Sequence, residues 1–162
     1  MVACLGFAAM TAQRDPTRAA VLVALAGLLA YGALRLGGVP AAFAALRRND
    51  LANAKRLLDQ TNPRFLNAEC RAKRAWVLAA LAEAAGDLPA ARAQLEAALA
   101  GAGLTRKAER GIALATLAAV EHRLGSPARG RELLDEAAAT SASPEVQRLV
   151  EKLRAEPPAP AA

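Results

Sequence analysis

The stretch that decides the fold of this sequence is GDLPAARAQL, residues 86–95, because close variants of it stand at two other places. The earlier variant is NDLANAKRLL at residues 49–58, and the later one is GSPARGRELL at residues 125–134. Their first residues are therefore 37 and then 39 positions apart. A segment that returns at such a period is typical of a protein built from repeated supersecondary units.

Each copy of the repeated stretch has the pattern of a turn followed by the start of a helix. Asp50, Asp87 and Ser126 are of the residue types that cap a helix N-terminus. Four positions after each cap stands a small residue, and eight positions after it stands a leucine. Residues at this spacing share one face of a helix, which we expect to be buried. The six residues are Ala54, Leu58, Ala91, Leu95, Gly130 and Leu134.

A second alanine-rich helix is expected before each turn, at about residues 40–48, 64–85 and 105–124. The repeating unit is then a helical hairpin. Hairpins of this length bury their apolar faces only against their neighbours, and about three of them are needed for a stable solenoid. A last helix is expected from Ser143, with Pro144 in its first turn and an apolar side that seals the open end of the stack.

The composition agrees with an all-α protein. The 162 residues are rich in alanine and leucine, which favour helices, and include only three Phe, one Trp and one Tyr. The fold that we expect is all-α.

We expect three structured parts along the chain, namely a transmembrane helix, a short α-solenoid and a capping helix. The predicted segments are an N-terminal tail at 1–17, the transmembrane helix at 18–39, the repeat domain at 40–142, the capping helix at 143–155 and a disordered Pro/Ala-rich tail at 156–162.

The membrane prediction depends on the stretch AAVLVALAGLLAYGAL, residues 19–34, which contains no charge. A bilayer span needs about 20 residues, so the prediction extends the helix past Arg35, whose guanidinium can reach the headgroups. A cleaved signal peptide is the rival interpretation, because AFA at residues 42–44 resembles a cleavage site. A buried helix of a globular protein is a third.

Basic residues on the two sides of this segment predict its orientation. Arg14 and Arg18 precede it, whereas Arg47, Arg48, Lys55 and Arg56 follow it. Positively charged flanks favour the cytoplasm, so we expect a single-pass protein of a bacterial inner membrane with a cytoplasmic repeat domain.

The hairpins resemble the tetratricopeptide repeats. That family places glycine at the turn, alanine at a fixed position of the second helix, and a small residue in the first helix. The resemblance covers about residues 40–140, although the family's tyrosine is replaced by Ala82 and Glu121. The matching residues are Leu78, Ala79, Gly86, Ala91, Leu95 and Ala98 in the second copy, and Leu117, Ala118, Gly125, Gly130, Leu134 and Ala137 in the third.

The resemblance implies a ligand groove, because tetratricopeptide repeats bind peptides or helices along the concave surface of their first helices. The family's clamp for a terminal carboxylate is not expected, since apolar residues such as Val39 and Val77 and the hydroxyl of Thr116 stand at its positions. Carried over residue by residue, the groove positions are Lys73, Trp76, Ala80, Ile112, Ala115, Ala119, His122 and Arg123.

Trp76 has two interpretations at this level. It falls on the groove side, but a shift of one residue in the alignment would bury it in the core. We keep both the core and the ligand-contact interpretations.

We expect no enzyme activity, cofactor or metal site. The only histidine, His122, adjoins Glu121, and adjacent helix residues point about 100° apart, so the two cannot act together on one substrate. Cys4 and Cys70 lie far apart without a metal-binding spacing.

The function that we expect is a membrane-anchored protein–protein interaction module, a scaffold or adaptor with a protein or peptide ligand in its groove. An alternative follows from the formal net charge of +6 and the basic cluster RAKRAW at residues 71–76. Such a surface could dock on anionic lipid headgroups or, with less support, on nucleic acid.

Overall fold

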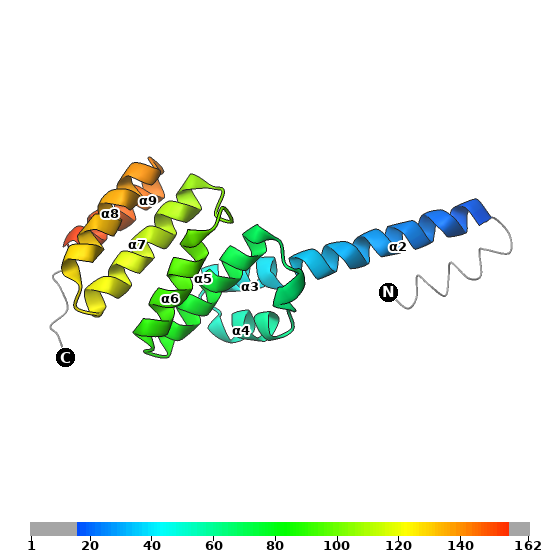
Figure 1. The fold of residues 1–162 in the computed structure, drawn as a ribbon, viewed down its shortest axis with the longest axis horizontal. Helices are drawn as coiled ribbons and strands as arrows, with labels where there is room; N and C mark the ends of the chain where they lie inside the picture. Colours follow the sequence, from blue (N-terminus) through cyan, green and yellow to red (C-terminus); the bar gives the residue numbers. More distant parts are fainter. Residues whose placement is uncertain (1–15, 156–162) are drawn as a thin grey trace.

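The computed structural model describes residues 16–155, and all regular structure within this range is helical. The all-α prediction is confirmed. Eight α-helices, labelled α2 to α9, and one 3-10 helix, η1, lie in the described range. One long helix, α2, extends away from a body formed by the others (Figure 1). The predicted tail at 156–162, and residues 1–15 of the predicted tail at 1–17, lie outside the described residues.

The body consists of three helical hairpins that follow one another along the chain (Figure 1). Within each hairpin the two helices pack together, and the first helices also pack on elements of the neighbouring hairpin. This is the repeat-like arrangement that the recurring stretches predict. The pairs are α3 (Val39–Arg47) with α4 (Leu51–Asp59), α5 (Ala68–Ala84) with α6 (Leu88–Ala100), and α7 (Lys107–Arg123) with α8 (Pro127–Thr140).

The second hairpin begins later than expected. Its first helix was predicted to start behind Pro63, but a single 3-10 turn, η1 (Pro63–Phe65), occupies that position. The helix α5 starts after Asn67, whose side-chain Oδ1 accepts a hydrogen bond from the N–H of Cys70 at 2.7 Å. Asn62 caps only the 3-10 turn, and Asn67 caps the helix itself.

The three hairpin turns have the same backbone geometry. In the second turn, the N–H of Gly86 donates to the carbonyl of Glu83 (3.0 Å), and the N–H of Asp87 donates to the carbonyl of Ala82 (2.9 Å). This pair of bonds is a Schellman motif, which requires a left-handed residue and recurs in the other two turns. The left-handed residues are Asn49, Gly86 and Gly125, with φ angles of 61°, 80° and 81°.

The residue after each left-handed position also precedes the next helix. The carboxylates of Asp50 and Asp87 accept hydrogen bonds from the N–H groups three residues later, at 3.1 Å and 3.0 Å, as the predicted caps require. Ser126 stands at the predicted N-cap position of α8, but its side chain makes no such hydrogen bond. Pro127 follows it in the first turn, where its fixed φ favours the helical conformation without a cap.

The residues predicted to share the buried helix face are all buried. Ala54, Ala91 and Gly130 are buried, Gly130 against α7, and the leucine four positions later in each copy is at most 3% exposed. The last helix, α9 (Pro144–Ala155), packs on α7 and α8 and buries Val146 and Val150 completely. The predicted capping helix is therefore present at the end of the stack.

The helix α2 (Pro16–Leu36) carries several exposed apolar side chains. It ends three residues before the predicted limit, because Gly37 adopts a left-handed φ of 55° and Val39 already belongs to the buried core of the first hairpin. Across residues 16–155, no helix combines the length and the apolar character that crossing a membrane requires. The exposed residues of α2 include Val21, Val23, Leu25, Leu28 and Leu29, which are between 50% and 65% exposed.

Candidate binding groove

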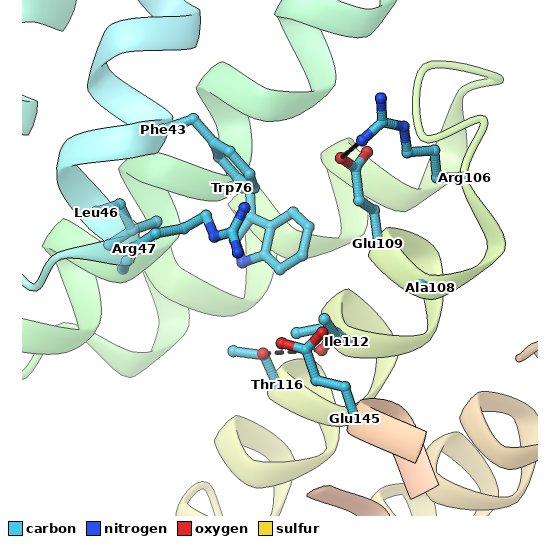
Figure 2. A pocket seen from close by; sticks show the side chains of 11 residues that line it. Phe43, Leu46, Arg47, Trp76, Arg106, Ala108, Glu109, Ile112, Thr116 and Glu145 are labelled. Atoms are coloured by element: carbon cyan, nitrogen blue, oxygen red, sulfur yellow. Dashed lines mark hydrogen bonds and ion pairs between the residues drawn. The ribbon is translucent and has the colours of Figure 1, made fainter. Parts of the chain in front are cut away.

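A cavity of about 440 Å³ opens among the first helices of the three hairpins (Figure 2). Its walls come from α3, α5 and α7, and the first turn of α9 closes one side. We call this cavity the groove. It is lined by Phe43, Leu46, Arg47, Trp76, Ala80, Arg106, Ala108, Glu109, Ile112, Thr116 and Glu145.

Trp76 forms part of the apolar wall of the groove. It is only 8% exposed, and its ring packs edge-on against Phe43 with centroids 5.2 Å apart and an angle of 66° between the planes. This edge-to-face arrangement is a favourable geometry for two aromatic rings. Trp76 is thus a core residue that joins the first two hairpins, and its remaining exposed edge lines the groove.

Lys73 lies next to the groove rather than in it. Its Nζ is 2.6 Å from Glu69 and 3.5 Å from Glu109, and 5.7 Å from the centre of the Phe43 ring. Burial disfavours the charged form, but the hydrogen bond to Glu69 and the charge of Glu109 outweigh this effect, so the pKa of Lys73 is raised. Lys73 therefore stays charged, with its charge balanced by two carboxylates.

Two charged residues at the edge of the groove, Arg47 and Glu145, have no oppositely charged partner among the described residues. Arg47 comes from α3 and Glu145 from the first turn of α9, and in Figure 2 they reach toward the cavity from different sides. No ion pair or side-chain hydrogen bond joins either of them to another residue in the described range 16–155. Arg106, by contrast, lies 3.8 Å from Glu109.

The structure brings together three of the eight residues predicted for the groove, namely Trp76, Ala80 and Ile112. Ala115 is completely buried in the core, and Ala119 is half-buried outside the lining of the groove. A step of three residues turns a helix side chain about 60° away from the starting direction. Ala115 is thereby rotated from the groove side of α7 into the core.

The other two predicted residues lie elsewhere. The ring of His122 rests on Gly130 of α8, so closely that a Cβ atom there would be 2.5 Å from Cδ2 of the histidine. His122 lines a separate hollow beside α8 and α9. Arg123 forms an ion pair with Glu83 of α5, with Nη1 and Oε1 2.6 Å apart.

Most of the residues that line the groove were not predicted from the sequence. A spacing of four residues relates Phe43 to Arg47 on α3, and Ala108 to Ile112 and Thr116 on α7. This stripe could have been found, because residues four apart lie one above the other on a helix. Glu145 had no comparable signal, since its place depends on how α9 packs across the end of the stack.

The basic cluster at residues 71–76 is largely engaged within the body. The guanidinium of Arg71 donates to the carbonyl of Leu66 at 2.7 Å, which holds the start of α5 to the preceding loop. Lys73 is paired as described above, and Trp76 is buried. Two of the three basic side chains of the cluster are therefore engaged by groups of the same body.

The described residues offer few groups for chemistry. Glu121 of α7 is 2% exposed and forms an ion pair with Arg92 of α6, with Nε and Oε1 3.0 Å apart. This ion pair links α6 to α7. Cys70 is buried, and burial raises the pKa of its thiol. No group of three or more His, Cys, Asp or Glu side chains comes together between residues 16 and 155 in a way that could hold a metal ion.

Comparison with known proteins identifies no relative. No protein-family model, no curated protein and no solved structure matches the chain.

Proposed function

We propose that this chain is a helical-repeat module of tetratricopeptide-like construction that binds a protein ligand in the groove. The observation that carries the proposal is the groove itself, an open cavity among the first helices with an apolar wall around Trp76 and Ile112. A concave, mainly apolar pocket with a few charged groups at its edge suits the recognition of a protein segment. The module would act as a scaffold or adaptor.

A photocrosslinking experiment in cells tests this proposal. We expect p-benzoylphenylalanine at Arg106, an exposed position on the rim, to form covalent adducts with a partner protein under illumination. The same residue at Arg129, which is exposed on α8 and is not among the residues that line the groove, is the matched control. Adducts that are absent at Arg106, or equally frequent at both positions, would argue against the groove as the binding surface. Gel mobility and mass spectrometry provide the measurement.

We further propose that α2 attaches the module to a membrane. Residues 19–34 of α2 carry no charge, and Val21, Leu25, Leu28 and Leu29 are exposed on it. An apolar environment would cover these side chains, and lipid provides one without a further protein. The basic residues that follow the helix favour a cytoplasmic position for the hairpins.

Membrane attachment leads to a second prediction. The chain should stay in the membrane fraction after a carbonate wash, and Leu28→Lys with Leu29→Lys should release it. Each lysine at the centre of an inserted helix costs about 2.5–3.5 kcal/mol. Leu28→Ala with Leu29→Ala is the control and should stay bound.

The same experiment separates the rival interpretations of α2. A reporter fused after Ala162 should be active on the cytoplasmic side. Complete release of the unaltered, full-length chain would refute attachment through α2, and release of a shortened chain would instead establish cleavage as for a signal peptide.

The alternative of a basic domain that docks on headgroups or nucleic acid has weaker support. Two of the residues that suggested it, Arg71 and Lys73, are engaged by a carbonyl and by carboxylates of the same body. Electrostatic docking also weakens steeply with salt, whereas binding in an apolar groove responds little. The salt dependence of partner binding therefore distinguishes the two functions.

A further inference from the structure

The charges around the groove indicate what kind of segment it takes, an inference that rests on the function proposed above. Arg47 and Glu145 are the two charged lining residues without a partner in the described part of the chain. They stand on different walls, one on α3 and one on α9 (Figure 2). The groove is thus positive at the α3 wall and negative at the α9 wall.

Between these two charges the wall is apolar. Phe43, Leu46, Trp76 and Ile112 line this part of the groove. The hydroxyl of Thr116 is already used, because its Oγ1 donates to the carbonyl of Ile112 at 2.9 Å. The space of about 440 Å³ is therefore large enough for a bulky apolar side chain, whereas a polar side chain would find few hydrogen-bond partners there.

A ligand that covers this site must also satisfy the two charges. An ionised group that is removed from water without a partner is strongly disfavoured, so a bound segment should supply an anion near Arg47 and a cation near Glu145. Opposite charges on two walls also fix the direction in which a segment lies. A peptide can supply both an anion and a cation, at separate positions, with ordinary acidic and basic side chains.

We propose that the groove binds a linear protein segment that carries one large apolar residue between an acidic and a basic residue. The acidic residue pairs with Arg47, the apolar residue packs against Trp76 and Ile112, and the basic residue pairs with Glu145. The charges of the two rim residues set the orientation of the segment.

Selection of displayed peptides tests this proposal. Random 12-residue peptides would be selected on the full chain in lipid nanodiscs, and in parallel on Arg47→Glu and Glu145→Lys. We expect wild-type selection to enrich an acidic and a basic residue on opposite sides of an apolar one. Selection on Arg47→Glu should exchange the acidic residue for a basic one, and selection on Glu145→Lys should exchange the basic residue for an acidic one.

Affinities measured by fluorescence anisotropy complete the test. A peptide enriched on the wild type should bind at least about tenfold more weakly to Arg47→Glu, and the peptide with the exchanged charge should restore binding; tenfold corresponds to about 1.4 kcal/mol. Arg64→Glu on η1 and Glu151→Lys on α9 are the matched controls, because they change the net charge equally at exposed positions outside the groove lining. Both controls should bind the wild-type peptide unchanged.

Three results would overturn the proposal. The first is that no peptide is enriched. The second is that the enriched peptides lack the acidic and basic residues on opposite sides of an apolar one, which we call the charge rule. The third is that the control substitutions weaken peptide binding as much as Arg47→Glu does. Self-association of the chain that Arg47→Glu abolishes, with no peptide enriched, would make a second copy the occupant and also refute it. If crosslinked adducts still form at Arg106 but the enriched peptides do not follow the charge rule, the proposed binding function is supported. Only the proposed ligand, a segment with an apolar residue between an acidic and a basic one, is then refuted.

Discussion

Replacing Trp76 by alanine should lower the free energy of unfolding by about 3–5 kcal/mol, as for other buried tryptophans. The side chain is 8% exposed and packs edge-on against Phe43, so its loss opens a cavity between the first and second hairpins. Urea unfolding of a chain that begins at Gly37, followed by circular dichroism, gives this free energy. Binding to the peptides described above should weaken as well, because the exposed edge of Trp76 lines the groove.

Trp76→Phe is the control that separates the two effects. It keeps an aromatic ring against Phe43 and should cost less stability than the alanine variant, while still reducing the wall that contacts the ligand. If Trp76→Ala unfolds at the same urea concentration as the wild type, the packing against Phe43 is not part of the core. If it unfolds earlier but binds peptide normally, Trp76 supports the fold alone.

Leu95→Ala should cost about 2–4 kcal/mol and should destabilise all three hairpins together. Leu95 is 1% exposed in the centre of the stack, and it belongs to a core that includes residues of α5, α7, α8 and α9. Neighbouring hairpins stabilise each other in a solenoid, so a cavity in the middle one weakens both of its interfaces. Circular dichroism melts should show one transition at a lower temperature.

Leu99→Ala provides the comparison for this prediction. Leu99 lies on the same helix and is only partly buried, so the same change of side chain should cost less. Equal effects of the two substitutions, or a melt of Leu95→Ala that matches the wild type, would mean that the repeated face of the second hairpin does not form the core that it shares with the third.

The hairpins could be predicted because their determinants are local. A left-handed residue at positions 49, 86 and 125, a following cap, and a small residue with a leucine one turn later all act within about ten residues of chain. These features define where a helix ends, where the next begins and which face is buried. The only failure among them, the side-chain cap of Ser126, concerns one hydrogen bond and not the turn.

The groove could be predicted only in part, because it depends on how helices pack. A small rotation of α7 about its axis decides whether Ile112 or Ala115 faces the cavity, and the sequence pattern allows both. Glu145 reaches the groove because α9 packs on α7, a contact between segments more than twenty residues apart in the chain. The start of α5 depended on a choice between two neighbouring caps, Asn62 and Asn67, each of which is used.

The shared geometry of the three turns has a consequence for how the chain folds. Only three residues separate the two helices of each hairpin, so these helices meet across a very short loop. Most packing then joins segments that are close in sequence, and proteins of such low contact order fold in microseconds to milliseconds. The second and third hairpins can each pack on the hairpin before them soon after their own second helix leaves the ribosome.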